Sequence, residues 1–149
     1  MRNFFSLQSS VARGCGAILV FAAVLAACQH KSPEQELLDK ADAVGSWIAT
    51  LQMAGEKWLA NSVPTSFVKS TCKEAGRDLD QAAGEAAKSQ ARPEVRDPLR
   101  QLISQAQAAG ASLRRAAAAN DRPGAAREAG RLSALGRQLE VWKQGLGPP

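Results

Sequence analysis

The chain has 149 residues, of which 45% are hydrophobic and 5% aromatic, and its formal net charge at pH 7 is +5. This length is sufficient for one domain with a modest core. The sequence holds a single histidine, His30, whereas helical proteins build haem and metal centres from several histidine or carboxylate ligands. We therefore expect a small domain without a cofactor or a metal ion.

The N-terminal segment has the composition of a secretory signal peptide. Residues 1–14 form a polar leader that carries two arginines, and residues 15–27 are a continuous apolar run, CGAILVFAAVLAA. A transmembrane helix needs roughly 20 apolar residues, so this run is too short to span a bilayer comfortably. Residues 1–27 are therefore predicted to be a signal peptide, which is absent from the mature protein.

The apolar run ends in the sequence LAAC at residues 25–28, which resembles the lipobox of bacterial lipoproteins. The resemblance implies that diacylglycerol is transferred to the sulfur of Cys28, that the chain is cleaved before this residue, and that the new amino group receives a fatty acid such as palmitate. In enterobacterial lipoproteins, an aspartate after the cysteine favours the inner membrane. Because Gln29 stands there, the resemblance implies the periplasmic face of the outer membrane. An ordinary signal peptide that leaves Cys28 free is the alternative.

Residues 28–31 are predicted to be a short tether, and residues 32–147 a helical domain. Ser32 and Gln35 form a capping box, with Pro33 at the first helical position. Apolar or small residues then recur in alternating steps of four and three, which indicates a helix over about residues 33–61 with one apolar face. That face consists of Leu37, Ala41, Val44, Ile48, Leu51, Gly55 and Trp58.

Three further helices with the same spacing are predicted over about residues 65–89, 97–119 and 122–145. The third is predicted to begin at Asp97, because Pro98 deep inside a helix would delete a hydrogen bond. The apolar faces consist of Val68, Cys72, Ala75, Leu79, Ala82 and Ala86 in the second helix, of Leu99, Leu102, Ala106, Ala109, Leu113 and Ala116 in the third, and of Leu132, Leu135, Leu139, Trp142 and Leu146 in the fourth.

This pattern predicts an all-α fold, an antiparallel up-down-up-down four-helix bundle, since short connections make consecutive helices antiparallel neighbours. A long helical hairpin whose apolar face is covered by a second chain is the alternative. Cys72 lies on the apolar face of the second helix and is the only thiol left if Cys15 and Cys28 are spent. We expect it to fill space in the core, with a reactive or dimer-forming thiol as the alternative.

The common catalytic patterns are missing from the sequence. No histidine is placed to activate a serine or threonine, and the GxSxG pattern of the α/β-hydrolases does not occur. Neither the ExxH pattern of di-metal bundles nor the CxxCH pattern of haem attachment occurs. We therefore expect a non-enzymatic protein.

Positive charge is concentrated in the C-terminal part of the chain. Residues 33–91 carry six Lys/Arg and nine Asp/Glu, whereas residues 92–149 carry ten and five, and nine of these ten cations are arginine. One interpretation is that an acidic first hairpin attracts a basic second hairpin, which contributes only about 0.2–1 kcal/mol per exposed pair. The other is a surface for an anionic partner, because arginine binds carboxylates and phosphates with two parallel donors.

The candidate partner-binding residues are one tryptophan and six arginines. Trp47 flanks the apolar face of the first helix, and a half-exposed tryptophan is a common anchor at interfaces. Arg100 and Arg114 are fourteen residues apart and therefore share one outward line of the third helix. The other candidates are Arg115, Arg127, Arg131 and Arg137. Nucleic acid is not an expected partner, because basic and aromatic residues do not alternate.

The expected function is that of a lipid-anchored adaptor or assembly factor, which binds another envelope protein through its helical bundle. Two alternatives stay open. A carrier similar to the pilotins, small helical lipoproteins that escort a secretion-channel protein to the outer membrane, would need an apolar groove between helices. A binder of anionic envelope polymers would use the arginine-rich second hairpin, and its affinity would fall as the salt concentration rises.

Overall fold

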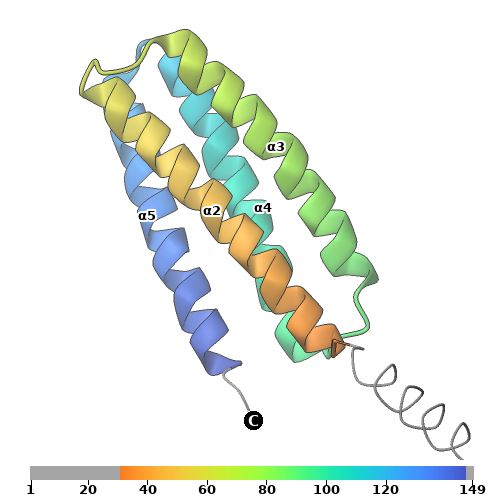
Figure 1. Ribbon diagram of the computed structural model, residues 1–149. Helices are drawn as coiled ribbons and strands as arrows, with labels where there is room; N and C mark the ends of the chain where they lie inside the picture. Colours follow the sequence, from red (N-terminus) through yellow and green to blue (C-terminus); the bar gives the residue numbers. More distant parts are fainter. Residues whose placement is uncertain (1–30, 147–149) are drawn as a thin grey trace, which may run out of the picture. The chain divides into compact units, whose positions relative to one another are not determined.

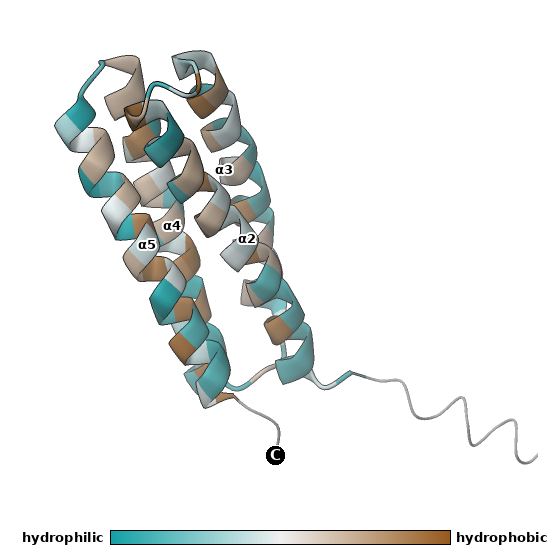
Figure 2. Ribbon diagram, turned by 60° about the vertical axis from the view of Figure 1, so that its left-hand side comes forward, coloured by the Kyte–Doolittle hydropathy of each residue, from teal (hydrophilic) through white to brown (hydrophobic). Residues whose placement is uncertain are grey.

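Four helices make up the described part of the chain, residues 31–146 of a computed structural model (Figure 1). They are α2 (Pro33–Leu59), α3 (Thr65–Lys88), α4 (Pro93–Ala118) and α5 (Arg122–Gly145). These residues contain no strand, and consecutive helices run antiparallel (Figures 1 and 2). The predicted all-α up-down-up-down bundle is confirmed.

Each helix packs against its two neighbours in the bundle. α2 contacts α3 and α5, and α4 contacts the same two helices. The diagonal pair α2 and α4 also touches, whereas α3 and α5 stay apart. One chain therefore covers its own apolar faces, and the second chain that a lone hairpin would require is not needed for the core.

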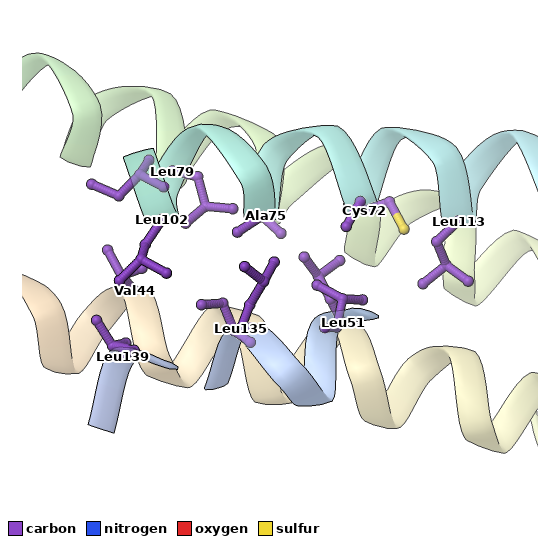
Figure 3. Packing of buried hydrophobic residues seen from close by; sticks show 14 of the residues in the cluster. Val44, Leu51, Cys72, Ala75, Leu79, Leu102, Leu113, Leu135 and Leu139 are labelled. Atoms are coloured by element: carbon purple, nitrogen blue, oxygen red, sulfur yellow. The ribbon is translucent and has the colours of Figure 1, made fainter. Parts of the chain in front are cut away.

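The predicted apolar faces form this core. All seven residues predicted for the face of α2 are buried. Figure 3 shows Leu51 of α2, Leu135 of α5, and Leu102 and Leu113 of α4 pointing into the same interior. Burial of one leucine side chain stabilises the fold by about 1.5–3 kcal/mol, so these residues contribute more than the many alanines between them. Three residues of the predicted faces are only half-buried, namely Ala82, Trp142 and Leu146.

The diagonal helices α2 and α4 approach each other through two glycines. A Cβ atom on Gly55 would lie 3.2 Å from Cδ1 of Leu113, and a Cβ atom on Gly110 would lie 3.2 Å from Cδ1 of Leu51. Each leucine thus packs where the opposite helix has no side chain. The missing Cβ atoms bring the two backbones close enough to share one core layer.

The connections at residues 60–64 and 119–121 lie at the same end of the bundle, and the helices before them end in the same type of cap. Asn61 and Asn120 adopt left-handed backbone conformations, with φ of 57° and 54°. After α2, the N–H of Ser62 donates to the carbonyl of Lys57 at 2.8 Å, which is the longer bond of a Schellman motif. The last carbonyls of both helices are satisfied in this way, so each helix ends at the asparagine.

Arg122, at the start of α5, joins these two connections. Its guanidinium donates to Oδ1 of Asn61 at 3.1 Å and to the carbonyl of Leu59, and its Cζ atom lies 5.6 Å from the centroid of the Trp58 ring. A cation is favourable beside the C-terminal carbonyls of α2 because of the helix dipole. The positive charge of Arg122 is therefore used within the fold.

The predicted start of the third helix is wrong, because α4 begins at Pro93 and not at Asp97. Pro98 lies inside the helix as its sixth residue. It cannot donate a hydrogen bond to the carbonyl four residues earlier, that of Glu94. Both residues are exposed, so water can take the place of the missing donor. The cost of the proline is therefore limited.

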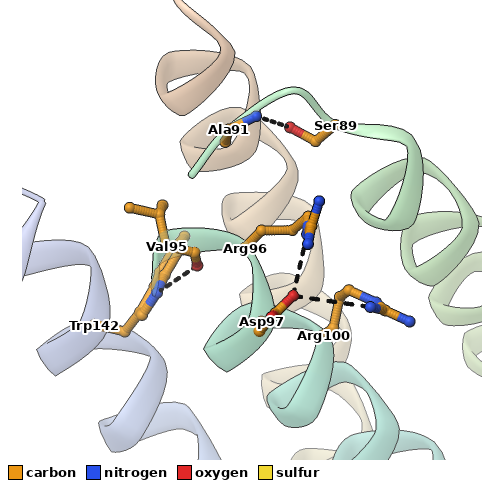
Figure 4. Close-up of polar contacts among 7 residues, drawn as sticks. All are labelled: Ser89, Ala91, Val95, Arg96, Asp97, Arg100 and Trp142. Atoms are coloured by element: carbon orange, nitrogen blue, oxygen red, sulfur yellow. Dashed lines mark hydrogen bonds and ion pairs between the residues drawn. The ribbon is translucent and has the colours of Figure 1, made fainter. Parts of the chain in front are cut away.

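A tertiary contact accounts for the additional turn of α4. Val95 is buried with 4% of its surface exposed, and its carbonyl accepts a hydrogen bond from Nε1 of Trp142 at 3.2 Å (Figure 4). The first turn of α4 thus packs against the last turns of α5. Ala91, just before the helix, is buried as well, and its N–H donates to Oγ of Ser89 at 3.2 Å.

Burial raises the pKa of the Cys72 thiol to about 11, against a small opposite effect of the Arg114 charge. The residue is 6% exposed. We predict that Cys72 reacts with a thiol reagent at pH 8 about a hundredfold more slowly in the native protein than in the unfolded chain, because a tenfold lower thiolate fraction accompanies each unit of pKa. The test uses residues 28–149 with Cys28→Ser, in which Cys72 is the only thiol.

The same shift gives a pH dependence. Because the folded protein holds the thiol proton more tightly than the unfolded chain does, the free energy of unfolding should fall as the pH rises from about 9 towards 11. The Cys72→Ala variant controls for alkaline effects that do not involve this thiol. Equal alkaline slopes for the two proteins would contradict this assignment.

Glycine-to-alanine substitutions should separate the packing role of Gly55 from helix propensity. Around Gly130 no atom lies within 4 Å of an added Cβ, so Gly130→Ala should raise the free energy of unfolding by about 0.5–1 kcal/mol. Gly55→Ala should lower it, since the new methyl group meets the fully buried Leu113 at 3.2 Å and the leucine must shift within the core. Urea unfolding followed by circular dichroism measures both, and equal gains would show that the α2–α4 contact is not tight.

Candidate interaction surface

The two ends of the bundle differ in charge. We divide each helix at its midpoint into a loop half, residues 46–76 and 106–133, which contains the connections 60–64 and 119–121, and a terminal half, residues 31–45, 77–105 and 134–146. The loop half carries eight Lys/Arg and four Asp/Glu, a net charge of +4. The terminal half carries nine and ten, a net charge of −1. Positive charge is therefore concentrated at one end of the bundle.

All six ion pairs of the described residues lie in the terminal half. Two of them, Arg92–Glu34 and Lys143–Asp42, join the α2–α3 hairpin to the α4–α5 hairpin. The others are Lys40–Glu85, Arg96–Asp97, Arg100–Asp97 and Lys143–Glu140. Figure 4 shows Arg96 and Arg100 on either side of the Asp97 carboxylate. The attraction between hairpins that the sequence suggested is thus limited to this half.

Two groups of the terminal half, Glu85 and Lys143, have pKa values that their hydrogen-bonded partners shift. Hydrogen bonds from Lys40 and Gln81 lower the pKa of the Glu85 carboxyl. Hydrogen bonds to Glu140 and Asp42 raise the pKa of the Lys143 ammonium group. Both shifts favour the charged forms, so these groups stabilise each other within the terminal half.

The loop half has no ion pair among its described residues. Arg122 joins the two connections, and Arg115 donates only to the neutral hydroxyl of Ser112, at 2.9 Å. The remaining cations of this half, all exposed, are Lys57, Lys69, Lys73, Arg114, Arg127 and Arg131. None of these six cations forms an ion pair with the described part of the chain.

A hollow of about 300 Å³ opens between α4 and α5 beside their connection. Its polar lining includes Arg115 and Ser112 from α4 and Arg127 and Glu128 from α5. Oε2 of Glu128 is buried and has no hydrogen-bond partner. Asp121 also lines the hollow, but its Oδ1 atom already accepts from the N–H of Gly124 at 2.9 Å and so caps α5. We call this site the α4–α5 hollow.

The structure brings four of the six predicted arginines into the loop half. These are Arg114, Arg115, Arg127 and Arg131. Arg100 lies in the terminal half, 3.8 Å from Asp97. Arg137 lies there too and donates to Oγ of Ser133 at 3.0 Å. The predicted line from Arg100 to Arg114 therefore runs from one half of the bundle into the other. Cys28, the predicted lipid attachment site, is outside the described residues.

Trp47 has a partner within the bundle. It is half-buried against the core, and its Nε1 atom donates to Oδ2 of Asp78 at 3.1 Å. It lines a hollow of about 190 Å³ between α2 and α3, where Lys40 also lies. A second hollow of about 270 Å³ follows along the same helices, and the Lys40–Glu85 pair borders both. Trp47 thus connects α2 to α3.

The sequence reasoning missed three lysines of the loop half, Lys57, Lys69 and Lys73, because it took its basic candidates from residues 92–149 only. The spacing contained a signal for two of them, since Lys69 and Lys73 are four residues apart, share one side of the helix and lie outside the predicted apolar face. The α4–α5 hollow could not be found in this way, because its residues come from two helices. Its two carboxylates offset part of the local positive charge.

Two further findings concern the described residues. Within 31–146, no three His, Cys, Asp or Glu side chains are placed to hold a metal ion. No helix in the same range is long and apolar enough to cross a bilayer. Comparisons with protein-family models, with curated proteins and with solved structures found no match to this chain.

Proposed function

We propose that this protein is a non-enzymatic, lipid-anchored adaptor or assembly factor of the bacterial envelope, whose helical bundle binds another envelope protein through its loop half. The observation that carries the proposal is the distribution of ion pairs. All six lie in the terminal half, whereas none of the eight exposed cations of the loop half forms an ion pair among the described residues. A partner with an acidic surface would supply the missing counter-charges.

Several such cations act together in recognition. An exposed ion pair contributes only about 0.2–1 kcal/mol, so one arginine alone would not hold a partner. A set of like charges on one end of a molecule increases the rate of encounter with an oppositely charged surface and favours one orientation. The loop half, with a net charge of +4, has this property.

The lipid anchor would place the loop half away from the bilayer. Only residues 29–31 separate Cys28 from the capping residue Ser32, a span of roughly 10 Å when extended. The start of α2 would then lie close to the lipid surface. Since α2 has 27 residues, its far end is about 40 Å along the helix axis. A partner in the periplasm could reach the loop half without contact with the membrane.

The two alternatives make different demands on the structure. A pilotin-like carrier would hold its client in the hollows between α2 and α3, which the Lys40–Glu85 and Trp47–Asp78 contacts now bridge. The client would have to displace both contacts. A binder of anionic polymers would use the same loop-half cations as the adaptor does, so the identity of the bound molecule separates these two functions.

The lipid anchor is tested by replacing its attachment site. We expect the wild-type protein to incorporate labelled palmitate and to sediment with membranes, and the Cys28→Ser variant to do neither, because acyl chains provide the attachment. Mass spectrometry of the mature wild-type protein gives a direct check. A mature N-terminus with an unmodified Cys28 thiol would contradict the proposal.

Binding by the loop half is tested by photo-crosslinking of the full-length protein in cells. We expect a photoreactive residue at Ala118 or Ala126, both exposed in the loop half, to form a discrete protein adduct. The controls are Ala87 and Gln90, which are exposed in the terminal half. Adducts with polysaccharide or lipid alone would support the polymer alternative. Absence of any adduct at Ala118 and Ala126 would contradict the adaptor function.

A further inference from the structure

We propose that the α4–α5 hollow binds an acidic segment of a polypeptide, with a side-chain carboxylate held between Arg115 and Arg127. This inference rests on the proposed function and names the chemistry of its partner. The hollow is a concave site of the loop half that two cations, Arg115 and Arg127, line from two different helices.

The two arginines have capacity for a carboxylate. Arg115 donates only to the hydroxyl of Ser112, at 2.9 Å, and Arg127 has no hydrogen bond or ion pair among the described residues. Hydrogen bonds between charged groups are roughly twice as strong as those between neutral groups. A carboxylate between the guanidinium groups would replace a weaker bond of Arg115 and give Arg127 its first partner.

The hollow also contains negative charge, because Glu128 and Asp121 line it beside the two arginines. A ligand with many closely spaced negative charges would be repelled by both carboxylates. An acidic polypeptide segment can place one carboxylate between the arginines and a neutral part of its backbone beside Glu128 and Asp121. A polypeptide segment is therefore the ligand that we infer for this lining.

The neighbouring cations would extend the contact beyond the hollow. Arg131 follows Arg127 by one helical turn on α5, and Arg114 precedes Arg115 on α4. With about 300 Å³, the hollow has room for a side chain and its backbone but not for a helix. We infer that one acidic residue enters the hollow and that its neighbours along the chain meet the outer cations.

The experiment measures binding of a defined probe to residues 28–149 with Cys28→Ser. The probe is a capped, fluorescent peptide of alternating glutamate and serine, and its matched control replaces glutamate with glutamine. The test variant is Arg115→Gln with Arg127→Gln. The control variant is Arg92→Gln with Arg100→Gln, which removes two exposed arginines from the terminal half and so changes the net charge equally. Circular dichroism checks that each variant keeps its helix content.

We expect the glutamate peptide to bind, the glutamine peptide not to bind, and the test variant to weaken binding at least about tenfold, while the control variant stays within about twofold. Equal effects of the two double variants, or no binding of the glutamate peptide, would overturn the inference.

Vesicles of phosphatidylglycerol and phosphatidylethanolamine provide the membrane control. Binding to these vesicles, but not to the glutamate peptide, would assign the surface to lipid and overturn the inference. The crosslinking experiment separates its failure from that of the proposed function. Protein adducts at Ala118 and Ala126 that persist when Arg115 and Arg127 are replaced would refute the hollow but leave the adaptor in place. Loss of these adducts supports both.

Discussion

The contact between the diagonal helices α2 and α4 determines how this small bundle is packed. Alanine-rich apolar faces bury little surface, so the helices must come close together before their leucines can meet. Gly55 and Gly110 make this approach possible, since each leaves space for a leucine of the opposite helix. With α2 and α4 drawn to the centre, α3 and α5 lie on opposite sides of this pair and do not touch.

The two ends of the bundle are held together by different interactions. At the loop end, backbone caps at Asn61 and Asn120 and the contacts of Arg122 with the end of α2 close the structure. At the terminal end, the Trp142–Val95 hydrogen bond and the ion pairs between helices do so. Because the loop end does not depend on ion pairs between its helices, a partner could bind its cations without breaking a contact that the fold requires.

Sequence reasoning predicted the helices and the core because both depend on local spacing. A period of three and four residues fixes which side of a helix is apolar, and every residue predicted for the four faces is buried or half-buried. The predicted start of α4 was wrong because the rule used for Pro98 considers only neighbouring residues. The burial of Val95 against Trp142 depends instead on two residues that are 47 positions apart and lie on different helices. For the arginines, the sequence did contain a signal, because the acidic neighbour of Arg100 is Asp97, three residues earlier on the same helix.

The arginines of α5 also run against what would stabilise that helix. Arg122 lies in its first turn, where the helix dipole disfavours a cation, and the carboxylate of the N-cap residue Asp121 offsets part of this effect. The contacts of Arg122 with α2 compensate as well. Arg127 and Arg131 have no such contact, and like charges four residues apart destabilise a helix by about 0.2–0.5 kcal/mol. The spacing of Arg127 and Arg131 therefore does not favour the helix, whereas the acidic partner proposed for the loop half would pair with both.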